Sequence, residues 1–291
     1  KGAGAQVTVV DVRTAKLLVG SRAQRAKDAG IALLRGFVPL QAQGSAGVRG
    51  IVVRQMNGDK AAGEQRTLPC DAVGMAGGWN PAIHLYSHSG GRAHWDDKAV
   101  CFVSGAAMPE QFSVGACNAT FALSQTLAEA AESGAVAARS AGFTATTTHF
   151  TVTEPVSEPT TAFWIAETGE PVSRRAKAFV DYRNDVSASD IELAVREGFE
   201  SIEHIKRYTA LGFGTDQGKL GNINGMALAA RAMGKPIDKV GTTTFRPNYL
   251  PITFGLFAGL ERGELFDPAR VTSPHEQHVA AGALFEDVGQ W

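Results

Sequence analysis

A short segment near the end of the chain has the residue types that bind a phosphate group. Its residues are Gly241, Thr242, Thr243, Thr244, Phe245 and Arg246. Threonine hydroxyls can donate hydrogen bonds to phosphate oxygens, and a guanidinium binds the same oxygens through two parallel, charge-assisted hydrogen bonds. We therefore regard Thr242, Thr243 and Arg246 as candidate phosphate ligands. A threonine-rich strand beside a surface arginine is the structural alternative.

An acidic residue near the start of the chain could bind a ribose. Asp11 stands near the end of the β-branched run from Gln6 to Val12, which has the composition of a buried parallel strand. In a dinucleotide-binding fold this position meets the ribose hydroxyls, and the glycine-rich phosphate turn lies about twenty residues earlier. Those earlier residues are not in the sequence, so an ordinary strand-end aspartate remains the alternative.

A turn of small residues could supply backbone donors to a pyrophosphate. Gly115 and Ala116 lie in an apolar segment that we predict to be a strand, and a long alanine-rich helix follows from about Thr120 to Ala141. Backbone N–H groups at such a turn favour an anion, and Phe121 and Leu123 would lie beside it. Ala116 stands where flavin and pyridine-nucleotide enzymes often have an acidic residue, and packing of the helix on a sheet is the alternative explanation.

The histidines and cysteines form no recognisable metal or catalytic motif. His275 and His278 are three residues apart, whereas the zinc motif H-E-x-x-H needs a spacing of four. The three cysteines, Cys70, Cys101 and Cys117, include no C-x-x-C pair and are expected to be free thiols in a reducing compartment. Because no nucleophile elbow or P-loop pattern occurs either, we predict no metal site and no catalytic residue in this sequence.

The composition limits the kinds of partner that the chain could bind. With 28 basic and 29 acidic residues the net charge is -1, which gives no polycationic surface for nucleic acid and no basic segment for an anionic membrane. No run approaches the roughly 18 apolar residues of a membrane-spanning helix, and no secretion signal opens the sequence. We expect a cytoplasmic protein that binds a small molecule or a protein partner.

The elements that would position these residues alternate between helix and strand over the first half of the chain. A helix is predicted from about Thr14 to Ala29, ending at Gly30. A hairpin turn is predicted at Asn57-Gly58. Predicted strands cover residues 31–40, 47–55, 66–75 and 112–118. This order predicts an α/β fold in which residues 1–141 form a partial dinucleotide-binding domain with a small antiparallel insertion.

The second half of the chain is expected to contain a linker and a helical module. Residues 142–172 are rich in threonine, proline, glutamate and serine and show no period, which indicates a linker. Residues 173–240 should form a compact helical module, and residues 241–291 a further region. The helices predicted in the module cover residues 187–198, 201–210 and 223–233. Both ends of the sequence interrupt a pattern, so we expect an internal piece of a longer chain.

The helical module resembles the [2Fe-2S] module of the bacterioferritin-associated ferredoxin type. The resemblance rests on the segments Phe179 to Val186, Ile202 to Thr209 and Gly212 to Lys219. Cluster-binding members of that family hold the iron with four cysteines. At or near those positions this chain has Asp181, Arg183, Asp216 and Gly221. Because such a cluster requires thiolates, we predict a ferredoxin-like module without an iron–sulfur cluster.

A module of this kind without its cluster is typical of the alpha, or large, subunits of heterotetrameric sarcosine oxidases, which the chain resembles over nearly its whole length. The segment Gly77 to Gly91 is similar to the late part of their pyridine nucleotide-disulfide oxidoreductase-like domain. The segments Phe245 to Gly255 and Phe285 to Trp291 are similar to the approach to their folate-binding aminomethyltransferase-like domain.

The resemblance implies one subunit of an oxidoreductase complex. A beta subunit would carry the flavin that dehydrogenates sarcosine, with gamma and delta subunits beside it. The products would be glycine, hydrogen peroxide and 5,10-methylenetetrahydrofolate, with tetrahydrofolate bound on a C-terminal domain outside this sequence. The chain would hold FMN at the beta interface through the Arg246 segment. It would bind NAD through Asp11, Gly115, Ala116, Phe121 and Leu123.

Two other interpretations of the sequence stay open. The chain could come from the large subunit of a related complex that dehydrogenates N-methylglutamate, proline or an opine. The missing cysteines argue against the cluster-bearing members, and the folate-type segment after Gly241 favours the sarcosine or N-methylglutamate branch. Alternatively, the chain could be a non-catalytic scaffold that positions partner subunits, which the alanine at position 116 leaves open.

Overall fold

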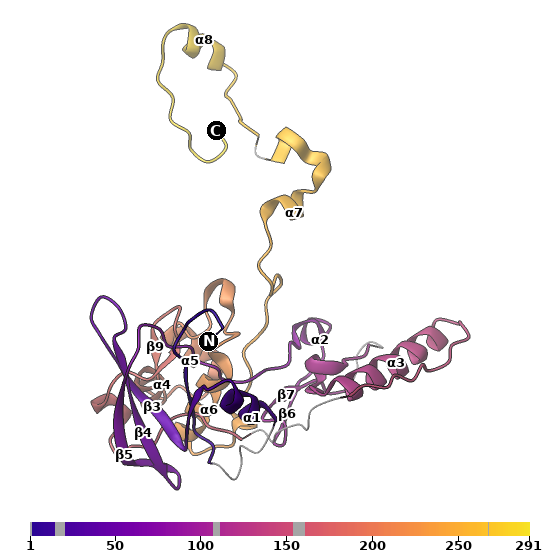
Figure 1. Ribbon diagram of the computed structural model, residues 1–291. Helices are drawn as coiled ribbons and strands as arrows, with labels where there is room; N and C mark the ends of the chain where they lie inside the picture. The colour runs from indigo at the N-terminus through magenta and orange to yellow at the C-terminus, as the bar shows by residue number, and fades with distance from the viewer. Residues whose placement is uncertain (1, 15–20, 107–110, 154–160, 267) are drawn as a thin grey trace. The chain divides into compact units, whose positions relative to one another are not determined.

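The computed structural model describes residues 2–14, 21–106, 111–153, 161–266 and 268–291. Over these ranges the chain has a mixed α/β architecture, as predicted, and Figure 1 traces its elements in order. The chain divides into two units, Lys1–Pro247 and Asn248–Trp291. The predicted domain boundaries at residues 141, 172 and 240 stay predictions.

The first unit begins with two parallel strands. β1 (Thr8–Asp11) pairs with β2 (Ala32–Arg35), and α1 (Ser21–Asp28) lies between them in the chain, as a parallel pair requires a crossover connection. The helix predicted from Thr14 is thus confirmed at its C-terminal end, and residues 15–20 lie outside the described ranges. The expected burial of β1 is wrong within the described structure. Val9 is 37% exposed, because no third strand among the described residues pairs with this sheet.

A three-stranded antiparallel sheet follows directly. β3 (Phe37–Gln43), β4 (Gly50–Asn57) and β5 (Lys60–Pro69) lie side by side in that order (Figure 1). The single strand predicted over residues 31–40 is wrong, because Gly36 has a φ of +71° and interrupts it. Its N–H donates to the carbonyl of Asp11 at 2.8 Å, which ties the turn to β1. The predicted hairpin turn is confirmed, since Asn57 pairs with Lys60.

The chain between this sheet and the helical module is less regular than predicted. β5 ends at Pro69, so the strand predicted to continue to residue 75 is too long. Short elements follow: α2 (His84–His88), β6 (His94–Asp96) and β7 (Cys101–Val103), the two strands being antiparallel. The strand predicted over residues 112–118 is also wrong. Its second half is the 3₁₀ turn η1 (Gly115–Asn118), because the φ of +64° at Gly115 is incompatible with a strand.

The helical module contains the three predicted helices, and the prediction is confirmed. They are α4 (Ala188–Arg196), α5 (Ile202–Thr209) and α6 (Asn222–Met233), while α3 (Leu123–Ser140) matches the long helix predicted earlier in the chain. Asp190 stabilises the start of α4 by accepting hydrogen bonds from the Ser187 backbone N–H at 2.8 Å and hydroxyl at 2.7 Å. The remaining elements are β8 (Phe179–Asp181), β9 (Val186–Ser187), η2 (Val172–Arg174), η3 (Gly214–Asp216) and η4 (Ile237–Lys239).

One hydrophobic core joins the helical module to the preceding part of the unit. Ile191 and Ile205, which are 0% exposed, lie in the same cluster of buried side chains as Ile83 and Phe102. Full burial of a side chain of this size contributes about 1.5–3 kcal/mol. Elements on both sides of the predicted linker therefore depend on a shared core.

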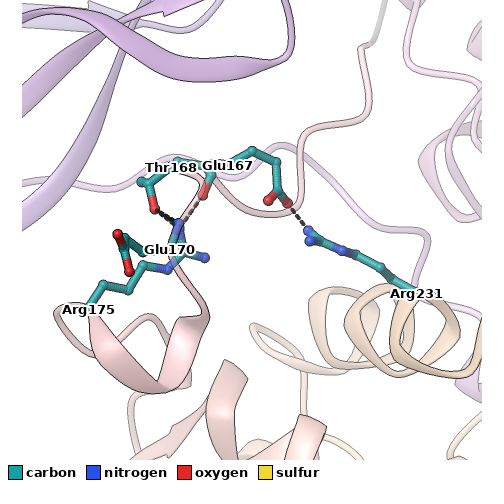
Figure 2. A network of polar contacts seen from close by, with 6 residues as sticks. Glu167, Thr168, Glu170, Arg175 and Arg231 are labelled. Atoms are coloured by element: carbon teal, nitrogen blue, oxygen red, sulfur yellow. Dashed lines mark hydrogen bonds and ion pairs between the residues drawn. The ribbon is translucent and has the colours of Figure 1, made fainter.

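Polar contacts from the predicted linker reinforce this connection. The backbone carbonyl of Glu167 accepts a hydrogen bond from the Ala61 N–H at 2.6 Å, and its carboxylate pairs with Arg231 of α6. Figure 2 shows Glu167 directed at Arg231, while Arg175 approaches Thr168, with a hydrogen bond of 3.3 Å between them. The segment around Glu167 thus contacts both the β4–β5 hairpin and α6.

The second unit consists of short helices and loops. They are α7 (Phe254–Ala258), η5 (Leu260–Phe266) and α8 (His275–Ala280). None of the described residues of this unit is buried, and Leu260 and Leu284 are almost fully exposed. Across the described ranges of both units, no helix combines the length and apolarity that crossing a membrane requires.

Candidate functional site

Most of the charged side chains that line an open pocket on the helical module are cationic. Its volume is about 380 Å³, within the range of roughly 300–1,000 Å³ that is usual for small-molecule sites. The charged residues that line it are Glu203, Lys206, Arg207 and Arg246. The other lining residues are Gly212, Phe213, Gly214 and Gln217.

Helix α5 supplies three of these charged side chains. Glu203, Lys206 and Arg207 follow the i, i+3, i+4 spacing that places side chains on one face of a helix. The Arg207 guanidinium lies 3.3 Å from the Glu203 carboxylate, and their side chains are 58% and 21% exposed. Glu203 is therefore the more buried partner of this ion pair, and Arg207 is the more exposed one.

The fourth charged residue is fixed through its backbone. The Gln217 side chain accepts a hydrogen bond from the Arg246 N–H at 2.9 Å and donates one to the Arg246 carbonyl at 3.2 Å. An amide that bonds both backbone groups of one residue substitutes for a neighbouring strand. The position of Arg246 at the pocket is thus set by Gln217 and not by strand pairing.

The residues before Arg246 are held in the same manner, each by a side chain from a different part of the unit. Glu203 accepts from the Thr244 N–H at 2.6 Å, and His88 of α2 lies 3.0 Å from the Phe245 carbonyl. Asn222 donates to the Thr243 hydroxyl at 2.7 Å. We call residues 243–246 the tethered segment. Its tethers are, in chain order, Asn222 for Thr243, Glu203 for Thr244, His88 for Phe245 and Gln217 for Arg246.

The predicted phosphate ligands occupy three different environments. Arg246 lines the pocket, and Thr242 is exposed. Thr243 is only 4% exposed, with its hydroxyl accepting a hydrogen bond from Asn222. Arg246 is the predicted ligand that the structure brings to the cationic pocket, whereas Thr243 faces the interior of the module.

The pocket holds more positive than negative charge. Partial burial raises the pKa of Glu203, but the hydrogen bond from the Thr244 N–H and the charges of Lys206 and Arg207 outweigh it, so the pKa lies below its usual value. Glu203 is therefore ionised at neutral pH. One carboxylate faces the cations of Lys206, Arg207 and Arg246, which leaves the pocket suited to an anion.

Asp181, one of the four positions at which the sequence resemblance predicts a lost cluster cysteine, is fully hydrogen-bonded. Asp181 Oδ1 accepts from the backbone N–H groups of Arg183 and Asn184 at 2.9 and 3.0 Å. Its Oδ2 accepts from the Gly212 N–H at 2.7 Å and the Asn184 amide at 3.1 Å. The three cysteines of the chain lie outside residues 173–240. The donor set of this module does not fit an iron–sulfur cluster, which needs thiolates.

Asp11, at the end of β1, already forms hydrogen bonds with Arg13. Asp11 accepts hydrogen bonds from the Arg13 backbone N–H at 2.8 Å and from the Arg13 guanidinium at 3.1 and 2.8 Å. Partial burial raises the pKa of Asp11, but these hydrogen bonds and the charges of Arg13 and Arg35 outweigh it and lower the pKa. A ribose would compete with Arg13 for this carboxylate.

The turn at Gly115 and Ala116 also has a hydrogen-bond partner within the chain. The Gly115 N–H donates to the Glu129 carboxylate of α3 at 2.9 Å, and the Thr120 hydroxyl donates to the same carboxylate at 2.5 Å. A Cβ at Gly115 would lie 2.8 Å from Thr126, so packing accounts for the glycine. The neighbouring Ala116 is exposed. The two other predicted NAD contacts are about half exposed, Phe121 at 50% and Leu123 at 53%.

Sequence reasoning missed Lys206, Arg207 and Gln217. The spacing of Glu203, Lys206 and Arg207 on a predicted helix indicates a charged face, but it does not indicate that Arg246 lies opposite. Tertiary contacts from Gln217 to Arg246 and from Glu203 to Thr244 bring them together. Among the described residues, no group of three histidine, cysteine or acidic side chains could hold a metal ion.

The mixed α/β fold of the chain is similar to that of one solved structure. The solved structure of L-proline dehydrogenase from P. horikoshii matches 87% of this chain and 50% of its own, with a TM-score of 0.61. The sequences are 16% identical, so the match shows the fold alone.

Sequence similarity gives the particular family. Residues 175–260 match the sarcosine oxidase A3 domain family. The sarcosine oxidase alpha subunit of Corynebacterium sp. (strain P-1) is 36% identical over 99% of the chain, and that of Rhizobium meliloti (strain 1021) is 37% identical over 79%. The chain belongs to the sarcosine oxidase alpha subunit family, and it spans 30% of the length of the Corynebacterium relative.

Proposed function

We propose that the chain is part of the alpha subunit of a heterotetrameric sarcosine oxidase. The complex would demethylate sarcosine oxidatively to glycine, reduce oxygen to hydrogen peroxide and transfer the one-carbon unit to tetrahydrofolate. Similarity to sarcosine oxidase alpha subunits over 99% of the chain carries this proposal. In it, the chain contributes binding surfaces, while a beta subunit carries the flavin that oxidises the amine and gamma and delta subunits complete the assembly.

The cationic pocket is the proposed site for the phosphate of FMN at the beta interface. Arg246 and the cations of α5 suit a phosphate, and Thr242 is exposed. FMN would supply electron transfer when bound. The residues of this chain would bind and orient its phosphate, and Gln217 would keep Arg246 in position.

NAD is proposed to bind through Asp11, Gly115, Ala116, Phe121 and Leu123. Two of these residues already have internal partners, Arg13 for Asp11 and Glu129 for Gly115. Binding would have to exchange these partners for ligand groups. Tetrahydrofolate is proposed to bind a further domain of the full-length subunit, toward which residues 241–291 lead.

The proposal is tested with the full-length subunit assembled with its partner subunits. Sarcosine should yield hydrogen peroxide and, when tetrahydrofolate is present, 5,10-methylenetetrahydrofolate. Arg246→Ala should reduce the FMN content of the purified complex without preventing assembly. Dehydrogenation of proline or N-methylglutamate with no turnover of sarcosine would favour the related dehydrogenase, which the shared fold with L-proline dehydrogenase makes the second candidate.

The role of NAD needs a separate measurement. The proposed site predicts that the purified complex retains NAD and that Asp11→Ala lowers the NAD content. A complex that turns over sarcosine but holds no NAD would instead give residues 1–141 a scaffold role.

A further inference from the structure

We infer that residues 248–291 form an apolar arm that docks within its own polypeptide, on a domain of the full-length alpha subunit outside residues 1–291. The surface that receives the apolar arm is an apolar groove with a basic rim. The inference rests on the membership of the chain in the sarcosine oxidase alpha subunit family. It does not depend on the proposed FMN or NAD sites.

The apolar arm exposes large hydrophobic side chains along its whole length. Leu260 and Leu284 have exposed fractions of 104% and 98%, and Phe254 and Phe257 are three residues apart on one face of α7. Soluble proteins rarely leave apolar patches of more than a few hundred Å² in water. An apolar arm without a core of its own therefore needs a partner surface. Further side chains that are more than half exposed are Leu256, Leu265, Val288 and Trp291.

The last part of the apolar arm has local structure before it docks. Residues 270–291 form a closed loop, in which the Arg270 N–H donates to the Gln290 carbonyl at 2.7 Å. The rings of His275 and Phe285 lie 4.7 Å apart across this loop. Local contacts of this kind reduce the conformational entropy that binding removes. The closed loop is therefore suited to docking with little rearrangement.

The charge of the apolar arm indicates the rim of the surface that receives it. Residues 248–291 contain six acidic residues but only two basic ones, Arg262 and Arg270, which gives a net charge of -4. Complementary charge around an apolar centre favours the correct partner and disfavours others. A basic rim therefore matches the apolar arm. Its acidic residues are Glu261, Glu264, Asp267, Glu276, Glu286 and Asp287.

The length of the relatives favours a partner surface in the same polypeptide. The chain spans 30% of the Corynebacterium subunit, so most of such a subunit lies outside residues 1–291. A surface in the same polypeptide meets the apolar arm at an effective concentration on the order of millimolar. An arm that waited for a separate subunit would leave Leu260 and Leu284 in water after synthesis, which promotes aggregation.

Photo-cross-linking in the assembled complex identifies the partner surface. Phe254 or Leu284 of the full-length subunit is replaced by p-benzoylphenylalanine, and the cross-linked peptides are identified by mass spectrometry. Both positions should cross-link to alpha-subunit peptides outside residues 1–291. Cross-links to beta, gamma or delta peptides, or to residues 1–247, overturn the inference, as does the absence of any specific cross-link.

Hydrogen exchange of the same complex tests which side chains hold the apolar arm. Leu284→Asp should speed exchange of the α8 amides at least about tenfold, because a carboxylate enters an apolar groove only at a large desolvation cost. The double variant Glu286→Gln with Asp287→Asn should speed it about two- to fivefold by removing the charges that face the basic rim. Gln277→Glu is the matched control. It adds the same charge at an exposed polar position of α8 and should leave exchange unchanged.

The outcomes separate the apolar arm from the proposed function. Unprotected α8 amides in the wild-type complex, or equal effects of Leu284→Asp and Gln277→Glu, overturn the inference. Unchanged exchange in the double variant overturns the basic rim. Sarcosine turnover by the wild-type complex is measured separately. An active complex with an unprotected arm refutes the docking alone, whereas an inactive complex with a docked arm refutes the proposed function alone.

Discussion

Asp181 organises the loop that follows β8. It is 4% exposed, and its carboxylate accepts hydrogen bonds from Arg183, Asn184 and Gly212. These donors link the end of β8 to the turn after α5. A buried carboxylate with its lone pairs occupied is a stabilising group, because removal leaves several donors without partners.

Replacing Asp181 should therefore destabilise the module. We expect Asp181→Ala to lower the free energy of unfolding by about 3 kcal/mol, since the Gly212 N–H and the loop donors lose their acceptor. Urea denaturation followed by circular dichroism measures the change. Asp185→Asn, an exposed neighbour in the same loop, is the control and should change stability by less than about 0.5 kcal/mol. Equal effects of the two variants would contradict this role for Asp181.

The same residue should give the module a pH dependence. Burial raises the pKa of Asp181, but hydrogen bonds from Gly212, Asn184 and Arg183 outweigh it, so the folded pKa lies below its usual value of 3.8. A lowered pKa contributes stability that is complete above the usual value and is lost as the pH falls through the folded value. The stability difference between the wild type and Asp181→Asn should thus shrink below about pH 4. A difference that stays constant down to pH 2 would argue against an ionised Asp181.

At the scale of elements, the start of α6 depends on a close fit between Asn222 and two glycines. A Cβ at Gly218 would lie 1.9 Å from Asn222 Oδ1, and one at Gly212 would lie 2.5 Å from the same atom. Asn222 is 7% exposed and donates to Gln217 and Thr243. The helix start is thereby joined to the turn before it and to the tethered segment.

Gly218→Ala should be much more destabilising than Gly234→Ala. Both glycines have a positive φ, +73° and +63°, so both substitutions strain the backbone by about 1–2 kcal/mol. Nothing lies within 4 Å of a Cβ at Gly234, whereas Gly218→Ala also collides with Asn222. We expect Gly218→Ala to lower the free energy of unfolding by more than about 3 kcal/mol, measured by thermal or urea unfolding. Similar losses for the two variants would show that the contact with Asn222 relaxes freely.

The elements that sequence predicted well are those whose signals are local. Helices α4, α5 and α6 have an apolar period and clear ends, and the Asn57-Gly58 hairpin has its own turn chemistry. The strand predictions failed over residues 70–75 and 112–118, because an apolar run does not show whether a partner strand is present. Gly36 and Gly115 were further causes of error, since each has a positive φ that an apolar pattern does not reveal.

The site could be predicted only in part for the same reason. Arg246 was recognised from its composition, and the structure places it at the pocket. The orientation of Thr243 could not be derived, because the tethered segment is held by side chains and follows no strand alternation. Lys206 and Arg207 come from about forty residues earlier in the chain, a separation at which spacing carries no information about contact.

At the scale of the whole molecule, the helical module and the preceding region should unfold together. Phe102 of β7 is 6% exposed and lies in the same core cluster as Ile191 of α4 and Met226 of α6. Phe102→Ala should lower the free energy of unfolding by about 3–5 kcal/mol. It should also lower hydrogen-exchange protection in α4 and α6 as well as in β7. Phe143→Ala, at a position that is 70% exposed, should change neither the free energy of unfolding nor the exchange protection of these elements. Loss of protection confined to β6 and β7 would instead support independent domains with a passive linker.

The tethered segment also implies an order for folding and ligand binding in the subunit. Its four tethers come from His88, Glu203, Gln217 and Asn222, which are spread over much of the first unit. The full set of tethers can form only when α2, α5 and the start of α6 lie together. Loading of a phosphate-bearing ligand would therefore be a late maturation step, reserved for chains that have finished folding.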